Sequence, residues 1–322
     1  MKQSSVEIVR LHTSKQLDGK TRLTANGCAE LYQDSVVVEE PLHVLLKSYT
    51  DKLGLISTLV MTTMRTPGND VELVTGWLNT QSFISFEDIE NIDNAHRLKD
   101  RYAAEEKHHL KLNMSASTLL DKSTPQNLVV IIATRNYRLD ESKLTRLSAI
   151  TSSCGICGDT EIENLSDNSR VSPLQSLQLN FTDLFAMAEA AKKNASLFCA
   201  TGGSHAAAFF AIENNQLDTQ LVSLREDVGR HNALDKLIGA HNIKQMQQFA
   251  LLLSGRVSAD LMQKVMCAGI PVVVSIGAPS SLAIELAESV GVILIGFVKE
   301  SSCNIYAGKQ QLNLHPSVSA PD

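Results

Sequence analysis

Cys154 and Cys157 form the only closely spaced cysteine pair in the sequence, within the segment Thr151-Ser-Ser-Cys-Gly-Ile-Cys-Gly158. Glycine accepts backbone angles that other residues avoid, and small polar residues contribute little to a core. The pair is therefore predicted to lie on an exposed, mobile loop, where thiols are free to react. Three chemistries use such a pair: a structural zinc site, a dithiol–disulfide redox site, and a sulfur relay through a cysteine persulfide.

The surrounding sequence separates these three chemistries. A structural zinc ion normally takes four ligands, and no second Cys or His pair stands at a suitable spacing, so zinc is disfavoured. A thioredoxin-like pair precedes a helix, whereas the residues after Cys157 are polar and acidic with no apolar stripe. Other redox roles stay open. A persulfide relay needs only a nucleophilic thiolate on a loop that reaches two partners.

Composition limits the class of protein. The chain has 322 residues, enough for two domains, and its formal charge of −6 offers no basic surface for nucleic acid. The N-terminal residues lack the apolar centre of a signal peptide, and the longest apolar runs are too short to span a bilayer. Scattered cysteines fit a reducing compartment. We therefore expect a cytoplasmic protein that has no membrane segment and does not bind nucleic acid.

The chain divides into two unlike halves. The predicted organisation is a poorly ordered N-terminus over 1–20, a smaller β-rich (α+β) domain over 21–150, a flexible linker carrying the cysteine pair over 151–175, an α/β domain over 176–310, and a tail over 311–322. In the first half, runs rich in β-branched residues predict strands, and a short helix is expected after the turn Thr66-Pro67-Gly68.

The second half alternates between strands and helices. A helix capped by Thr182, a strand hairpin around Asn214-Asn215, a helix from Arg230, and a helix ending at Gly269 are expected in turn. Short, continuously apolar strands indicate an α/β sheet covered on both faces. Ligands of such sheets bind where the loops leave the strand ends. Polar clusters fall at those places: 201–205, 226–232, 254–256 and 277–281.

Each cluster has a ligand-binding and a structural interpretation. The Gly202-Gly203 pair is either a turn or an anion cradle made by exposed N–H groups. The guanidinium groups of Arg230 and Arg256 suit phosphate, and a salt bridge to a nearby aspartate explains either one alone equally well. For His205 and the histidine after Arg230, ligand-binding or structural roles are favoured. Together the clusters favour a phosphate-bearing, nucleotide-like ligand.

Read in order, these motifs resemble the formate dehydrogenase accessory sulfurtransferase family over residues 35 to 307. The resemblance rests on the following segments: MRTPGNDVELVTGWL (64–78), CGICG (154–158), TGGSHAAAF (201–209), EDVGRHNALDKLIG (226–239), SGRVSADLMQKVMCAGIP (254–271) and APSSLAIELAESVG (278–291). It implies that the C-terminal domain has a cytidine deaminase-like fold. Deamination itself is excluded, because His205-Ala-Ala207 lacks the catalytic glutamate and no Pro-Cys-x-x-Cys follows.

The resemblance also implies a function. Family members accept persulfide sulfur from a cysteine desulfurase and deliver it to the bis(molybdopterin guanine dinucleotide) molybdenum cofactor, which formate dehydrogenase requires for activity. Cys154 matches the persulfide-carrying cysteine, and Cys157 an auxiliary one. No cofactor is expected to stay bound, GDP is expected to mimic the substrate, and a homodimer is expected. The implied cofactor-binding residues are Gly202, Gly203, His205, Gly229, Arg230, His231, Asn232, Ser254, Gly255, Arg256, Phe297, Val298, Lys299, Glu300, Ser301 and Ser302.

One segment departs from the family pattern, in which two arginines follow the last core strand. Lys299 replaces the first and keeps the charge but loses the planar, bidentate fork, and Ser302 replaces the second. Either other cations compensate for this change, or the affinity for the cofactor is altered. A rival class also stays open, a chaperone that carries the cofactor without moving sulfur.

Overall fold

The structure is a computed structural model that describes residues 2–12, 28–50, 54–81, 84, 86–94, 127–138 and 167–314. Its strands are β1 (Gln3–His12), β2 (Cys28–Val37), β3 (Glu40–Thr50), β4 (Gly54–Arg65), β5 (Ile89–Asn94), β6 (Leu128–Ala133), β7 (Leu177–Leu179), β8 (His205–Glu213), β9 (Gln216–Asp227), β10 (Phe249–Leu253), β11 (Val272–Ser275), β12 (Ile293–Gly296), β13 (Asn304–Ala307) and β14 (Leu312–Leu314). Its helices are α1 (Asp70–Gln81), α6 (Phe181–Asn194), α7 (Ser196–Thr201), α8 (Arg230–Gly239), α9 (Ala259–Ala268) and α10 (Ser281–Val290), with 3₁₀ turns at 86–88, 243–248 and 309–311.

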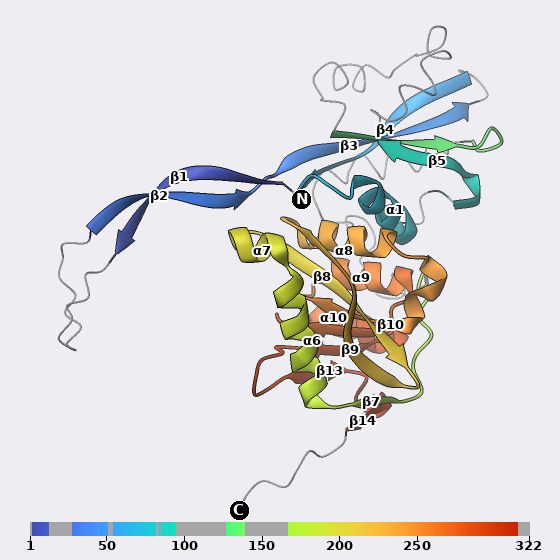
Figure 1. Cartoon of the computed structure of the whole chain (residues 1–322). Helices are drawn as coiled ribbons and strands as arrows, with labels where there is room; N and C mark the ends of the chain where they lie inside the picture. Colours follow the sequence, from blue (N-terminus) through green and yellow to red (C-terminus); the bar gives the residue numbers. More distant parts are fainter. Residues whose placement is uncertain are drawn as a thin grey trace, which may run out of the picture.

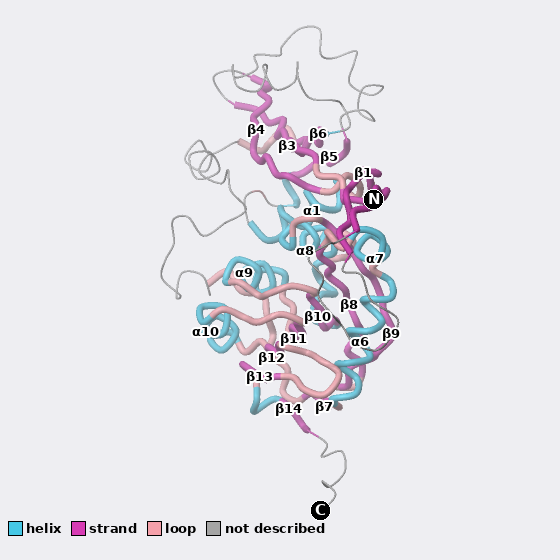
Figure 2. The backbone as a smooth tube through the Cα atoms, turned by 90° about the vertical axis from the view of Figure 1, so that its left-hand side faces the viewer, coloured by secondary structure: helices cyan, strands magenta, loops and turns pink. Residues whose placement is uncertain are grey.

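The strands form three sheets (Figure 1). β1 and β2 pair as an antiparallel ribbon that extends away from the rest of the molecule. A four-stranded sheet has the order β4-β3-β6-β5, and an eight-stranded mixed sheet has the order β13-β12-β11-β10-β8-β9-β7-β14. Helix α1 lies between the four-stranded sheet and α8 of the larger α/β unit (Figures 1 and 2).

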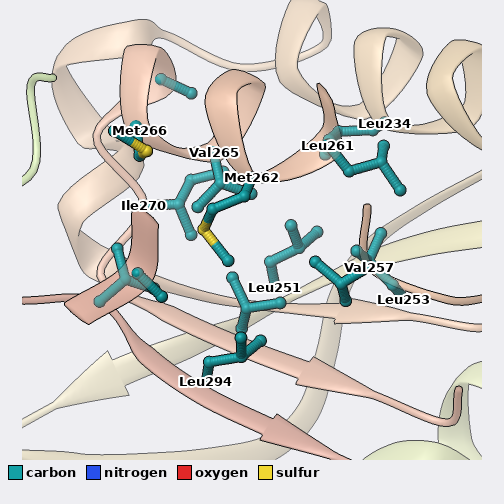
Figure 3. Packing of buried hydrophobic residues seen from close by; sticks show 14 of the residues in the cluster. Leu234, Leu251, Leu253, Val257, Leu261, Met262, Val265, Met266, Ile270 and Leu294 are labelled. Carbon is teal, nitrogen blue, oxygen red and sulfur yellow. The ribbon is translucent and has the colours of Figure 1, made fainter. Parts of the chain in front are cut away.

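The α/β unit is built on alternation along its central strands. Successive strand residues point to opposite faces, so Phe209 and Leu251 face one side of the sheet while Phe210 and Leu252 face the other. Helices α8, α9 and α10 cover the first face, where side chains such as Met262 fill the space above the strands (Figure 3). Helix α6 covers the second face. The observed architecture is α/β, as predicted.

The four-stranded sheet has a core of its own beneath α1. Leu42, Val44 and Ile131 from the sheet and Trp77 from α1 are among its buried side chains. The sheet is mixed, since β3 pairs antiparallel with β4 and parallel with β6. The strands and the short helix that we expected in this half are present.

The two halves meet where α1 crosses α8 at two glycines. A Cβ at Gly76 would lie 1.9 Å from the backbone oxygen of Asp235, and a Cβ at Gly239 would lie 1.8 Å from that of Glu72. No side chain fits at either glycine, so the two backbones are in contact. Arg225 of β9 adds an ion pair to Glu72, with an Nε–Oε2 distance of 2.7 Å.

Several expectations for the chain ends and the linker need correction. Residues 3–12, which lie in the predicted poorly ordered N-terminus, form β1 and pair with β2. Apolar and charged side chains alternate over Val6-Glu7-Ile8, which is the pattern of a strand. The linker is described from residue 167, where Arg170 N donates to Met266 O and Leu174 packs on the core. Residues 312–314 form β14, which pairs parallel with β7.

Helix α6 also differs from expectation. Its N-cap is Asn180 rather than Thr182, and the helical run breaks at Ala195 into α6 and α7. Within the described residues, no helix is long and apolar enough to cross a membrane. The cytidine deaminase-like comparison and the domain division stay predictions.

Candidate functional site

The ends of five strands bring the predicted polar clusters to one edge of the eight-stranded sheet. β10, β11 and β12 run parallel, so their carboxyl ends meet there at residues 254–256, 276–277 and 297–299. β8 is antiparallel to β10 and begins at the same edge with His205, opposite Asp227 at the end of β9. Backbone hydrogen bonds join the ends of neighbouring strands: Ile276 N donates to Leu253 O, and Phe297 N donates to Gly277 O.

A pocket of about 550 Å³ opens at this edge, on the face covered by α6. Its walls are mainly apolar, with Phe185 of α6 and Phe198 of α7 among them, and its charged lining residues are Lys192, Lys299 and Glu189. Of the predicted cofactor-binding residues, six line the pocket: Gly202, Gly203, His205, Ser254, Val298 and Lys299.

Cationic groups gather beside the pocket, around His205. A Cβ at Gly255 would lie 3.2 Å from Nδ1 of His205 and 4.0 Å from Cδ of Arg230, so these three residues are in close contact. Burial, then the positive charges of Arg230 and Arg256, lower the pKa of His205, and Asp227 acts in the opposite direction. Burial disfavours the charged imidazolium, and the two arginine charges repel it further. The positive potential of the arginines, unlike burial, attracts an anion.

Among the described residues, three buried polar atoms at the starts of α8 and α9 have no hydrogen-bond partner: Nε of Arg230, Nε2 of His231 and Oγ of Ser258, the N-cap of α9. Buried polar groups are normally paired, so orphaned ones call for an explanation. Burial, with Arg230 and other cations, lowers the pKa of His231 to about 4. His231 is therefore neutral at neutral pH, and its 3.9 Å approach to Asp260 Oδ2 is not an ion pair.

The salt-bridge interpretation of the two arginines fails in this structure. Asp227 pairs with Lys236, and Asp235 pairs with Lys264, so neither aspartate neutralises an arginine. Among the described residues, no ion pair forms at Arg230 or Arg256. Within the part of the chain that the structure describes, both guanidinium groups therefore lack an acidic partner.

Several backbone amides of the predicted cofactor-binding residues form hydrogen bonds within the protein. The N–H of Gly202 donates to Phe198 O at 2.7 Å, and the N–H of Gly203 donates to Thr201 Oγ1 at 3.1 Å, so these two amides are satisfied within their own turn. The N–H of Gly229 likewise donates to the Asp227 carboxylate.

Two predicted polar side chains also have internal partners. The amide of Asn232 donates to Met64 O and Asp227 and accepts from Thr63, so it joins the two halves of the molecule. Ser254 Oγ accepts from Ala206 N. These contacts place Asn232 at the junction between the halves, where it also contacts Asp227 at the ligand edge.

The segment after β12 forms a tight turn, in which Lys299 N donates to Ser302 O at 2.9 Å. Phe297 has φ of 53°, a left-handed conformation that is unfavourable for a bulky residue and that marks functional sites. The residue is 39% exposed, and Lys299 Nζ lies 5.9 Å from the centroid of its ring. Val298 is buried, whereas Glu300, Ser301 and Ser302 are exposed outside the pocket.

Ser275, which sequence reasoning missed, and the two acids of the predicted 226–232 cluster hold this edge together. Ser275 Oγ donates to Gly255 O at 2.6 Å and accepts from Gly277 N, and Glu226 and Asp227 each accept several hydrogen bonds. The sequence signal for Glu226 and Asp227 was their position at the end of a predicted strand, shortly before Arg230.

The cysteines Cys154 and Cys157 lie outside the described residues. Within those residues, no group of three or more His, Cys, Asp or Glu could hold a metal ion.

Comparison with known proteins agrees with this architecture. The sequence model of the FdhD/NarQ family matches residues 37–313. A sulfur carrier protein FdhD from Mycolicibacterium paratuberculosis is 37% identical over 290 residues, covering 89% of this chain and 94% of the relative. The sulfur carrier protein FdhD of Sulfolobus acidocaldarius is 34% identical over 289 residues, covering 88% and 92%.

A solved structure has the same fold. The crystal structure of a protein assigned as a formate dehydrogenase accessory protein from Desulfotalea psychrophila superposes with a TM-score of 0.57 at 19% identity, covering 95% of this chain and 99% of that one. The family match spans the four-stranded sheet and nearly all of the α/β unit, including the edge described above. This chain belongs to the FdhD/NarQ family.

Proposed function

We propose that this protein is a sulfur carrier that serves formate dehydrogenase. Cys154 accepts persulfide sulfur from a cysteine desulfurase and transfers it to the bis(molybdopterin guanine dinucleotide) molybdenum cofactor, which is bound as a substrate at the sheet edge. Membership of a family whose relatives are named sulfur carrier proteins supports the sulfur chemistry. The protein is accordingly a sulfurtransferase that acts in the cytoplasm as a homodimer.

The transfer to Cys154 needs no external oxidant. The Cys154 thiolate attacks the outer sulfur of the donor persulfide, the donor's S–S bond breaks, and its electron pair leaves on the donor thiolate. In the delivery step the bond between the Cys154 sulfur and the carried sulfur atom breaks, and its electron pair stays on Cys154, which becomes a thiolate again. The acceptor, the reduced molybdenum of the cofactor, supplies the electron pair for the new bond to sulfur.

One observation carries the proposed cofactor site: an apolar pocket shares one sheet edge with Arg230 and Arg256, which form no ion pair among the described residues. The pocket suits the guanine ring, and the exposed ring of Phe297 offers a further stacking surface beside it. Arg230 and Arg256 suit the phosphates, because guanidinium groups form bidentate, charge-assisted bonds to phosphate oxygens. Lys299 adds charge at the mouth of the pocket.

Mass spectrometry tests the sulfur step. The wild type, Cys154→Ala and Cys157→Ala are incubated with a cysteine desulfurase and cysteine. We expect the mass of one added sulfur atom in the wild type and in Cys157→Ala, and no such adduct in Cys154→Ala. An adduct that persists without Cys154 would overturn the assignment. The Cys154→Ala variant also separates the two classes of protein. If the protein is a chaperone that moves no sulfur, the variant still activates formate dehydrogenase, whereas a sulfurtransferase loses this function.

Calorimetric titration with GDP tests the cofactor site. Arg230→Gln removes the guanidinium group whose Nε is buried without a partner, so we expect GDP affinity to fall on the order of tenfold. Arg135→Gln, at an exposed arginine outside the site, is the matched control and should bind GDP as the wild type does. Equal affinity in both variants would remove the phosphate-binding role of Arg230.

A further inference from the structure

Two consecutive acidic residues end strand β9, and both are fully enclosed. Glu226 is 1% exposed and Asp227 is 0% exposed. Because successive residues of a strand point to opposite faces of the sheet, their carboxylates act on opposite sides of the ligand edge. α7 and α8, the helices that these carboxylates contact, both lie at the end of the α/β unit that faces the β1–β2 ribbon and α1 (Figures 1 and 2).

Glu226 holds the segment that forms one wall of the pocket. Oε2 accepts from Leu197 N at 2.9 Å, and Oε1 accepts from Phe198 N at 2.7 Å and from Ser204 Oγ at 2.9 Å. One carboxylate thus joins the start of α7 to Ser204, three residues beyond the end of that helix, through charge-assisted hydrogen bonds. Phe198, Ser204 and the glycines between them line the pocket.

Asp227 holds the cationic side of the same edge. Oδ1 accepts from Gly229 N at 2.9 Å, which sets the residue preceding Arg230 and His231 at the start of α8. Oδ2 accepts from Thr66 N at 3.1 Å and pairs with Lys236 Nζ at 2.6 Å. The first turn of α8 is therefore tied to the four-stranded half of the molecule through this carboxylate.

We propose that Glu226 and Asp227 are positioning residues that set the two walls of the ligand site separately. Glu226 orients the apolar wall that receives the ring, and Asp227 orients the cationic wall that receives the phosphates. Neither carboxylate touches the ligand. The assignment of ring and phosphate to the two walls rests on the proposed function, while the division of labour between the two carboxylates rests on their contacts.

Isosteric amides test the proposal with minimal change in volume. In Glu226→Gln the amide nitrogen must face a backbone N–H of α7, so one of these contacts becomes donor against donor. In Asp227→Asn the same conflict arises at Gly229 or at Thr66. The matched controls are Glu213→Gln and Asp218→Asn, which alter exposed carboxylates at the other end of the β8–β9 hairpin.

The binding readout separates positioning from general destabilisation. Guanosine probes the ring wall and inorganic pyrophosphate probes the cationic wall, each by calorimetry on the full chain. We expect Glu226→Gln to weaken guanosine binding on the order of tenfold and to leave pyrophosphate binding unchanged, and Asp227→Asn to do the reverse. If each variant weakens both ligands equally, or neither ligand, the separate roles are refuted.

Amide hydrogen exchange tests the positioning without any ligand. Glu226→Gln should speed exchange at Leu197 and Phe198 but not at Gly229, and Asp227→Asn should speed exchange at Gly229 but not at the two α7 amides. Uniform acceleration in either variant would overturn the inference. If the wild type binds neither probe, the proposed ligand site fails, and the exchange pattern still decides whether the two carboxylates act separately.

A double variant keeps the test decisive if Asp227→Asn does not fold, and a serine variant isolates the contribution of the Glu226 carboxylate. The double variant Asp227→Asn/Lys236→Gln removes the cation that Asp227 neutralises, and it should show the same Gly229-specific exchange. Ser204→Ala removes only one of the three hydrogen bonds to Glu226. It should give a smaller loss of guanosine affinity than Glu226→Gln, and a loss as large would contradict the role of the carboxylate.

Discussion

Nζ of Lys236 lies 2.6 Å from Oδ2 of Asp227, and both side chains are completely buried. The same ammonium group donates to Thr66 O at 2.8 Å. A buried charge is tolerated only when it is paired and hydrogen-bonded. This ion pair therefore fixes the loop that precedes α1 onto α8, next to the cationic cluster.

Lys236→Met should destabilise the protein strongly, because it leaves the Asp227 carboxylate buried without its cation. Removing one partner of a buried ion pair costs about 3–5 kcal/mol, so we expect a loss of that size in the free energy of unfolding measured with urea. Lys244→Met, at an exposed lysine, serves as the control. A loss below about 1 kcal/mol, the size typical of an exposed ion pair, would contradict the stabilising role of this buried pair.

Gly76→Ala should destabilise the junction between the two halves. Alanine normally stabilises a helix relative to glycine by about 1 kcal/mol. Here its Cβ would lie 1.9 Å from Asp235 O, so the α1–α8 crossing must open, and we expect a net loss of about 2–3 kcal/mol. Thermal unfolding of Gly76→Ala against Gln81→Ala, at the end of the same helix, measures it. An increased melting temperature for Gly76→Ala would contradict the close crossing.

Stability should fall on acidification because of His231. Its pKa is about 4 in the folded protein and near 6.5 in the unfolded chain, so between these values the unfolded state binds more protons. The contribution is fully present above pH 6.5 and is lost as the pH falls toward 4, by as much as about 3 kcal/mol. Urea unfolding across this window should show a shallower pH dependence for His231→Gln than for the wild type. Identical slopes would show that His231 titrates normally.

Ser302→Arg should strengthen GDP binding if the departure from the family pattern weakens the grip on phosphate. Ser302 is exposed, and its backbone oxygen closes the turn from Lys299, so an arginine side chain fits without a clash in the core. A new guanidinium–phosphate contact should raise affinity on the order of tenfold. Equal affinities for the wild type and the variant would show that the cations already present compensate.

Local sequence predicted the elements of the α/β unit well, because its signals are local. The hairpin at Asn214-Asn215 is confirmed by two positive φ angles, and the helix end at Gly269 by its left-handed conformation. The gathering of polar clusters at one sheet edge also followed from the order of strands and helices.

The partners of individual polar groups could not be predicted, because they depend on segments far apart in the chain. Asn232 is occupied by Met64 and Thr63, and Asp227 by Thr66, all from the other half of the molecule. The amides of Gly202 and Gly203 are satisfied within their own turn, since the helix splits at Ala195. No periodicity signals either outcome.

The parallel pairing of β7 with β14 joins the first and last strands of the α/β unit. These strands are separated in sequence by nearly the whole unit, so their contact has one of the largest loop-closure entropies in the fold. During synthesis the outer edge of β7 stays uncovered until Leu314 has left the ribosome, and folding of this unit cannot be completed before then. Premature termination before β14 would leave the backbone groups of β7 exposed at the sheet edge, where another chain can pair with them.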